Sequence, residues 1–184
     1  MDQRVVISGF GGQGIMSMAQ LIVYAGMMDG KNVSWVPSYG PEMRGGTAYC
    51  NLVVSDMKIG SPVVTKPNTL IVMNLPSLIK FEKSLVPNGL LLMNSSIISQ
   101  RPARNDIRPY GIKINDLAVE LGNLRTANMI MLGAYVELTK AVSDDSVFAS
   151  IKKVLGGAKK ELVSLNIDAF KLGAKSVHAM CAKI

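Results

Sequence analysis

The sequence is poor in the residues from which metal and redox sites are built. Its 184 residues include two cysteines, Cys50 and Cys181, and a single histidine, His178. Two cysteines so far apart exclude a disulfide framework, a four-cysteine zinc site and an iron–sulfur cluster held by this chain alone. No arrangement of Asp, Ser or Cys marks His178 as a base. We therefore expect neither a metal site nor a catalytic residue in this chain.

Uninterrupted apolar segments and charged residues are also scarce. The longest uncharged run, residues 5–28, is broken by glycines and does not suit a membrane-spanning helix. The N-terminus has no basic segment followed by an apolar stretch, so we expect no signal peptide, no membrane contact and a cytoplasmic location. Charged residues make up 18% of the chain and hydrophobic residues 48%, a composition that excludes intrinsic disorder.

Charge is distributed unevenly along the chain. Residues 1–60 carry four basic and four acidic side chains, and the whole net charge of +7 comes from residues 61–184. Positive charge favours anionic partners. Aromatic residues are only 5% of the chain and do not alternate with the basic ones, so we expect no nucleic-acid binding. The sparse charge of residues 1–60 has two interpretations: a deeply buried sheet core, or a surface covered by another protein.

Short apolar runs alternate with longer helical patterns along the chain. This alternation predicts one α/β domain over residues 1–184, Rossmann-like, with a largely parallel sheet flanked by helices and a helical C-terminal third. Ser143 is expected to cap one helix and Asn166 the last one. Strands are expected at 4–8, 32–36, 47–55, 69–73 and 89–93, and helices at 15–28, 76–85, 115–121, 128–142, 144–155 and 168–182.

A glycine-rich turn follows the first expected strand. Gly9, Gly11 and Gly14 occupy the three glycine positions of a GxGxxG pattern, with Gly12 and Gln13 between them. Glycine permits a tight turn and a close approach of the backbone to a ligand. The helix N-terminus that follows offers unpaired N–H groups to a phosphate, and Gln13 adds a side-chain amide. The alternative is that these glycines only allow close packing of strand and helix.

A nicotinamide dinucleotide site is the third alternative for this turn. Such a site has an Asp or Glu about 20 residues further on, at the end of the second strand. Residues 34–39 contain no carboxylate, and Glu42 lies within a Gly/Pro-rich loop instead. The sequence therefore counts against a stand-alone NAD(P)-type oxidoreductase.

A second glycine-rich loop follows the expected second strand. Its candidate binding residues are Ser38, Tyr39, Arg44, Gly45 and Gly46. An arginine next to glycines can bind a phosphate or carboxylate with two hydrogen bonds. The alternative is a surface ion pair between Arg44 and Glu42 of the same loop. Asn74, Asn94 and Ser95 follow the next two strands and are weaker candidates for the same crevice, because Asn and Ser favour turns anyway.

Taken together, the motifs resemble the gamma subunit of 2-oxoacid:ferredoxin oxidoreductases, most closely the 2-oxoglutarate and branched-chain 2-oxoacid members. The segments that carry the resemblance are SGFGGQGI (8–15), SWVPSYGPEMRGGTAYCNLVVSD (34–56), IGSPVV (59–64), LIVMNLPS (70–77), NMIMLGAY (128–135) and NIDAFKLGAK (166–175). The joint pattern is specific, and it extends from residue 1 to about residue 180.

The resemblance implies a subunit of an enzyme that decarboxylates a 2-oxoacid on thiamine diphosphate, reduces ferredoxin through iron–sulfur clusters and transfers the acyl group to coenzyme A. The chain has no GDG motif with a distal Asn-Asn and no clustered cysteines. We therefore expect both cofactors on the alpha and beta subunits, with a delta subunit as an open alternative. The gamma subunit belongs to the coenzyme A side of the reaction, so the two glycine-rich loops are expected to hold its phosphates. A purely structural subunit remains the rival.

Replacing Arg44 tests this expectation. In the assembled enzyme, Arg44→Ala should raise the coenzyme A concentration needed for half-maximal turnover, because a bidentate contact to phosphate is lost. The measurement is the KM for coenzyme A at a saturating 2-oxoacid concentration. An unchanged KM would remove Arg44 from this role.

Overall fold

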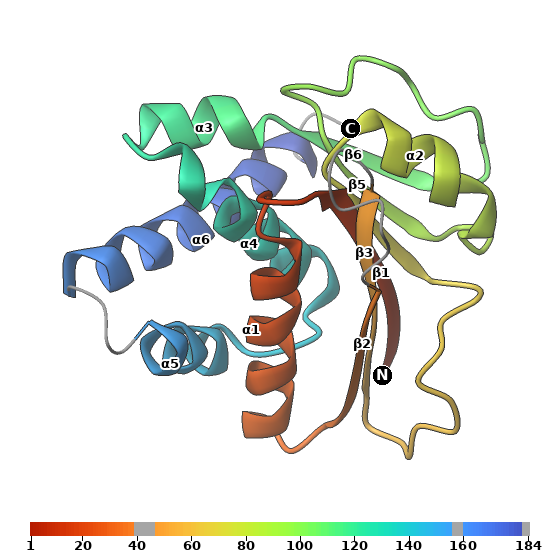
Figure 1. Ribbon diagram of the computed structural model, residues 1–184, viewed down its shortest axis with the longest axis horizontal. Helices are drawn as coiled ribbons and strands as arrows, with labels where there is room; N and C mark the ends of the chain where they lie inside the picture. The colour runs from red at the N-terminus through yellow and green to blue at the C-terminus, as the bar shows by residue number, and fades with distance from the viewer. Residues whose placement is uncertain (39–46, 156–159, 182–184) are drawn as a thin grey trace.

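A computed structural model describes residues 1–38, 47–155 and 160–181, and it is built around a six-stranded sheet in the order β2-β3-β1-β4-β5-β6 (Figure 1). The strands are β1 (Asp2–Phe10), β2 (Asn32–Ser38), β3 (Thr47–Ser55), β4 (Thr69–Val72), β5 (Leu90–Asn94) and β6 (Arg108–Ile112). The strands expected from the sequence are all present. β6 is an addition to the expected strands, and its Pro109 is compatible with an edge strand.

The sheet is parallel from β1 through β4 and β5 to β6, so the expected largely parallel α/β sheet is confirmed. β3 is the exception, since it runs antiparallel to both β1 and β2. β2 is therefore separated from β1 by one strand, and it points the same way as β1. The ends of β1 and β2 and the start of β3 consequently share one edge of the sheet, which we call the carboxyl edge.

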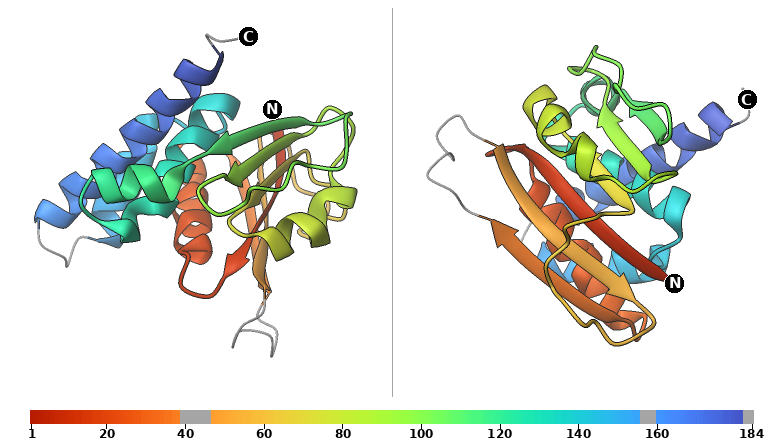
Figure 2. Two further views of the ribbon diagram at one scale, coloured as in Figure 1. Left: turned by 90° about the horizontal axis from the view of Figure 1, so that it is seen from above. Right: turned by 90° about the vertical axis from the view of Figure 1, so that its right-hand side faces the viewer.

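The helices are divided unequally between the two faces of the sheet. α1, α3, α4, α5 and α6 cover one face, and α2 lies on the other (Figures 1 and 2). The helical C-terminal third therefore packs over the sheet, as expected. The helices are α1 (Ile15–Met28), α2 (Leu75–Phe81), α3 (Ile114–Glu120), α4 (Ala127–Thr139), α5 (Asp144–Val154) and α6 (Lys160–Cys181), with short 3₁₀ turns at Glu82–Ser84 and Leu124–Thr126. No helix in the described residues is long and apolar enough to cross a membrane.

Alternation along β1 explains how one strand serves both layers. Val5 and Ile7 belong to the larger apolar cluster under α1 and α4, whereas Val6 belongs to the smaller cluster under α2. Successive side chains of a strand point to opposite faces, so a continuous apolar run is what a central, doubly covered strand requires.

Two helix boundaries test the capping expectations. α5 begins as expected, because the Ser143 side chain accepts a hydrogen bond from the Ser146 N–H. The expectation for Asn166 was wrong: α6 begins at Lys160, and the Asn166 amide donates to the Leu162 carbonyl from inside the helix. An Asn acts as an N-cap only where a helix begins, and here the apolar positions of α6 keep residues 160–166 helical against the core.

α4 and α6 pack with their backbones in close contact. A Cβ on Gly133 would overlap the carbonyl oxygen of Phe170, and a Cβ on Gly173 would overlap that of Ile130. Each helix therefore presents a glycine to the backbone of the other. This close approach fixes the position of α4, whose N-terminus reaches the carboxyl edge.

Adding a methyl group at this crossing should separate the helices. We expect Gly133→Ala to lower the free energy of unfolding by about 2–3 kcal/mol, because backbone atoms must move to admit it. Gly60→Ala is the control, since a Cβ at Gly60 meets nothing within 4 Å; its effect should stay within about 0.5 kcal/mol. Denaturant titration followed by circular dichroism measures both, and equal midpoints for the two variants would contradict the close-packing argument.

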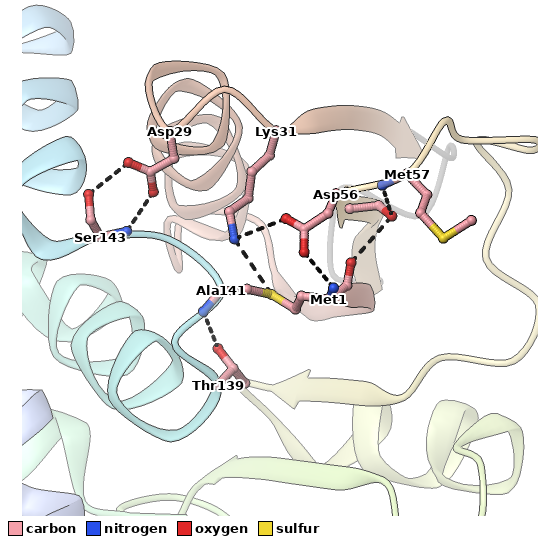
Figure 3. Close-up of polar contacts among 9 residues, drawn as sticks. Met1, Asp29, Lys31, Asp56, Met57, Thr139, Ala141 and Ser143 are labelled. Atoms are coloured by element: carbon pink, nitrogen blue, oxygen red, sulfur yellow. Dashed lines mark hydrogen bonds and ion pairs between the residues drawn. The ribbon is translucent and has the colours of Figure 1, made fainter.

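Asp29 joins the end of α1 to the start of α5 (Figure 3). Its carboxylate accepts hydrogen bonds from Ser143 N at 2.6 Å, Ser143 Oγ at 2.7 Å and Ser146 Oγ at 2.5 Å. Burial alone would raise the pKa of Asp29, but the bonds from Ser146 and Ser143, helped by the charge of Lys31, hold it below the usual value. Asp29 therefore acts as a second cap on α5.

The lowered pKa predicts how stability depends on pH. The contribution of Asp29 should be complete above its unfolded pKa of about 3.9 and should be lost as the pH falls through the lower folded pKa. Asp29→Asn should cost about 1 kcal/mol at pH 7, the size of a lost helix cap. The difference between wild type and variant should shrink below about pH 4. Asp168→Asn, at an exposed position, is the control for unfolding measured at pH 7, 5 and 3.5; a difference that stays constant with pH would contradict the assignment.

Candidate functional site

The turn from β1 into α1 requires glycine at two positions for packing. A Cβ on Gly9 would lie 2.7 Å from Oε1 of Gln13 and 2.8 Å from Cβ of Met73. A Cβ on Gly14, where φ is +73°, would overlap the side-chain amide of Asn128. Packing therefore accounts for the first and last glycines of the motif.

The middle of the same turn faces open space. Gly12 has a φ of +90°, and a Cβ there would have no neighbour within 4 Å. Gly11, beside it, is exposed. Nothing in the described residues blocks the approach of a ligand to this part of the backbone. The motif thus combines two packing glycines with an exposed centre.

Gln13 holds the turn in this shape. Its Oε1 accepts hydrogen bonds from Phe10 N at 2.6 Å and Asn74 Nδ2 at 3.4 Å, and its Nε2 donates to the Met73 carbonyl at 3.2 Å. The side chain expected to contact a ligand is therefore largely occupied by the protein. Its first role is to fix the loop against the end of β4.

Asn74 extends this network into the core. It caps α2 by accepting from the Ser77 N–H at 2.9 Å and the Ser77 hydroxyl at 2.6 Å. The Ser8 hydroxyl donates to Ser77 Oγ at 2.9 Å, and all three side chains are buried. Asn94 is buried as well, with its amide 3.2 Å from Oδ1 of Asn115. Asn74 and Asn94 are thus at the carboxyl edge, but they serve the fold.

A cavity of about 510 Å³ opens beside the exposed centre of the turn. Its walls include Gly12, Gln13 and Gly14 on one side and Arg125, Ala127 and Asn128 on the other, with Asn115 and Leu124 at its margin. The Asn128 amide donates to the Gly14 carbonyl at 3.2 Å, so the two walls are directly joined.

The N-termini of two helices open into this cavity. α1 follows Gly14 and its first turn receives no side-chain cap, whereas α4 continues from the 3₁₀ turn at Leu124–Thr126, where the Ala127 N–H donates to the Leu124 carbonyl. The uncapped N–H groups of α1 and the positive ends of the two helix dipoles favour an anion. Arg125 is exposed and is the only charged side chain among the described residues that line the cavity. The arrangement is suited to hold a phosphate or carboxylate.

The other predicted binding residues lie at or beyond the border of the described chain. Ser38 ends β2 and is half-buried at the carboxyl edge. Thr47 begins β3 opposite Phe10, so both ends of the second glycine-rich loop lie at the edge where the first loop is found. Tyr39, Arg44, Gly45 and Gly46 are outside the described residues.

The topology adds a reason against a nicotinamide site. The strand between β1 and β2 is β3, which presents its start rather than its end at the carboxyl edge. A ribose-binding carboxylate would come from the end of a parallel neighbour of β1. β2 is one strand too far away, and its described residues carry no acid.

Arg125 and Asn128 line the cavity but were not predicted as site residues from the sequence. Both belong to the run LGNLRTAN (121–128), which precedes an apolar helix, and Asn123 caps its 3₁₀ turn by accepting from the Arg125 N–H. The available signal was a cation, Arg125, directly before a helix. Whether this cation lies at a binding site depends on where α4 begins relative to α1, which the residue pattern does not specify.

Cys50 is not a reactive thiol, and the described residues form no cluster that could hold a metal ion. Burial raises the pKa of the Cys50 thiol to about 12, so it stays protonated and unreactive. No three His, Cys, Asp or Glu side chains in residues 1–38, 47–155 and 160–181 lie close enough to hold a metal ion.

Comparison with known proteins identifies the family. The family model described as pyruvate ferredoxin/flavodoxin oxidoreductase matches residues 4–176, and the chain belongs to this family. The family-level resemblance drawn from the motifs is thereby confirmed.

Two relatives illustrate the relationship. The VorA subunit of ketoisovalerate oxidoreductase from Methanothermobacter thermautotrophicus is 35% identical over 95% of this chain, which spans 36% of VorA. The KorC subunit of 2-oxoglutarate synthase from Methanocaldococcus jannaschii is 33% identical over 94% of this chain and 92% of its own length. The same domain therefore occurs in a much longer chain and in a chain of similar length.

Two solved structures share the fold. The gamma subunit of a keto/oxoacid ferredoxin oxidoreductase from Geobacter sulfurreducens is 27% identical, with a TM-score of 0.82 over 96% of this chain and 99% of its own. The 2-oxoglutarate:ferredoxin oxidoreductase from Magnetococcus marinus, solved with 2-oxoglutarate, coenzyme A and succinyl-CoA bound, has a TM-score of 0.87 over 95% of this chain and 31% of its own. The latter is 23% identical, and its likeness shows the fold.

Proposed function

We propose that this chain is the gamma subunit of a cytoplasmic 2-oxoacid:ferredoxin oxidoreductase, acting as one domain. The reaction converts a 2-oxoacid and coenzyme A into carbon dioxide and an acyl-CoA while ferredoxin is reduced. Support comes from the family assignment and from the VorA and KorC relatives. Alpha and beta chains would carry thiamine diphosphate and the iron–sulfur clusters, with a delta chain as a further partner, and this chain would be inactive alone.

The observation that carries the binding role is the cavity at the carboxyl edge. Coenzyme A has a diphosphate and a ribose phosphate, and it supplies the thiol that receives the acyl group. The open backbone at Gly12, the uncapped start of α1 and the Arg125 guanidinium together provide donors and positive charge for such an anion. Tyr39, Arg44, Gly45 and Gly46, with Ser38, are proposed to close the same site from the second loop.

One observation favours the rival, a purely structural subunit. Gly9, Gln13 and Gly14 are all engaged in packing or internal hydrogen bonds. Under this alternative the glycine motif shapes the turn, and the neighbouring cavity has no ligand. The two functions differ in what they predict for Arg125, whose side chain makes no hydrogen bond or ion pair among the described residues.

Purification from the native host tests the proposed function. The tagged chain would be isolated anaerobically and assayed for coenzyme A-dependent viologen reduction with a panel of 2-oxoacids. Larger companions carrying iron and thiamine diphosphate, with turnover of one substrate, are expected. A chain that elutes alone while a control complex survives the same procedure would overturn the proposal, and NADH binding would be measured next.

Arg125→Ala separates binding from structure in the assembled enzyme. We expect the KM for coenzyme A to rise about tenfold, the effect of losing one charge-assisted contact to phosphate. The KM for the 2-oxoacid and the unfolding midpoint should not change, because Arg125 is exposed. Arg101→Ala, at an exposed arginine outside the cavity, is the matched control. Equal coenzyme A kinetics in both variants would favour the structural subunit.

A further inference from the structure

One face of the sheet is left without a helix over β2 and most of β3, since α2 reaches only β1 and the Tyr49 end of β3. The right-hand view of Figure 2 shows these strands uncovered except for the segment that follows β3. The strand register places Ser34 and Val36 of β2 on this face with Asn51 and Val53 of β3. These side chains are uncharged, and Ser34, Val36 and Asn51 are only half-buried.

The outer strand on this side carries Pro37 but lacks the charges that usually protect an edge. β2 reads NVSWVPS and contains no charged residue. Exposed edge strands normally carry charges, most often lysine, which prevent pairing with other chains. An uncharged edge strand beside uncharged side chains of β3 is characteristic of a surface that another chain covers.

A cavity of about 520 Å³ lies on this face, at the edge of the sheet opposite the glycine-rich turn. Val53 and Val64 are buried in its floor, and residues 57–66 form its outer wall. The cavity is therefore bounded by the sheet on one side and by an irregular segment on the other. It shares no lining residue with the cavity beside Arg125.

Positive charge surrounds this second cavity. Arg4, Lys58 and Lys66 line it, against a single acid, Asp2. Arg4 Nε lies 2.9 Å from Asp2 Oδ2, so that acid is already paired. Lys58 and Lys66 are exposed and form no ion pair within the described residues. Two positive charges are thus available to an acidic partner.

Apolar side chains project beside these charges. Met57 is 75% exposed and Val63 is 57% exposed, and both belong to the wall of the cavity. Figure 3 shows the Met57 side chain directed away from the polar contacts of Met1 and Asp56. A small anion would leave these apolar groups in water, whereas a protein segment would cover them.

We propose that this face docks an acidic segment of a companion subunit, with an apolar side chain entering the cavity and carboxylates meeting Lys58 and Lys66. The inference rests on the proposed function, under which the chain works within a complex. An acidic occupant is inferred because its carboxylates would complement the positive charges of Lys58 and Lys66. The occurrence of this domain within the longer VorA chain supports a neighbouring protein surface.

Charge reversal tests the docking site in the native complex. The tagged double variant Lys58→Glu, Lys66→Glu should recover companions at about one tenth of the wild-type yield, because like charges then face each other. The matched control is Lys152→Glu, Lys175→Glu, which makes the same change in net charge at exposed positions on α5 and α6. Unfolding midpoints of the free variants confirm that both are folded.

Hydrogen exchange provides a second, mutation-free readout. Amides of residues 57–66 and β2 should exchange more slowly in the complex than in the free chain. Wild-type companion yield for the first double variant, or equal exchange in both states, would overturn the docking site and leave the proposed function standing. If the wild-type chain recovers no companions and no 2-oxoacid-dependent activity, both proposals fail together.

Discussion

The closeness of α4 to the glycine-rich turn determines the shape of the carboxyl edge. There is no room for a side chain at Gly14, and the Asn128 amide donates directly to the Gly14 carbonyl. This contact brings the start of α4, with Arg125, beside the open backbone of Gly12. α4 can take this position because Gly133 and Gly173 let it lie against α6. The candidate site therefore depends on glycines in three separate elements, only one of which is a recognised binding motif.

The two faces of the sheet differ in how completely helices cover them. Five helices and the larger apolar cluster lie on one face, where they hold the fold together. The other face has α2 and a smaller cluster, and its β2–β3 half is thinly covered. The low charge of residues 1–60 is explained by burial at the centre of β1, whereas β2 and the outer residues Tyr49 and Asn51 of β3 are only half-buried. A covering by another protein is the proposal made for these half-buried residues.

The sequence was most informative where local chemistry decides the structure. The strands, the start of α5 at Ser143 and the helical C-terminal third followed from apolar pattern and capping residues. Asn166 was misleading because tertiary contacts along α6 outweigh a local capping preference. Gln13 was read as a ligand donor, but Asn74 and Met73, sixty residues away, occupy its amide. Arg125 was missed for the same reason: its importance arises from which helix ends meet, a property of topology and not of spacing.

The insertion of β3 between β1 and β2 also has a consequence for biosynthesis. β2 and β3 are adjacent in both chain and sheet, so they can pair as soon as both have been made. β1 pairs with β3 and β4, which begin at Thr47 and Thr69, far behind it in the chain. During synthesis, the apolar residues 5–7 of β1 therefore remain unpaired until β3 and β4 have been made, seconds later. Until then a segment whose side chains are fully buried in the finished protein is exposed to aggregation, and a chaperone that binds short apolar segments would find its first target there.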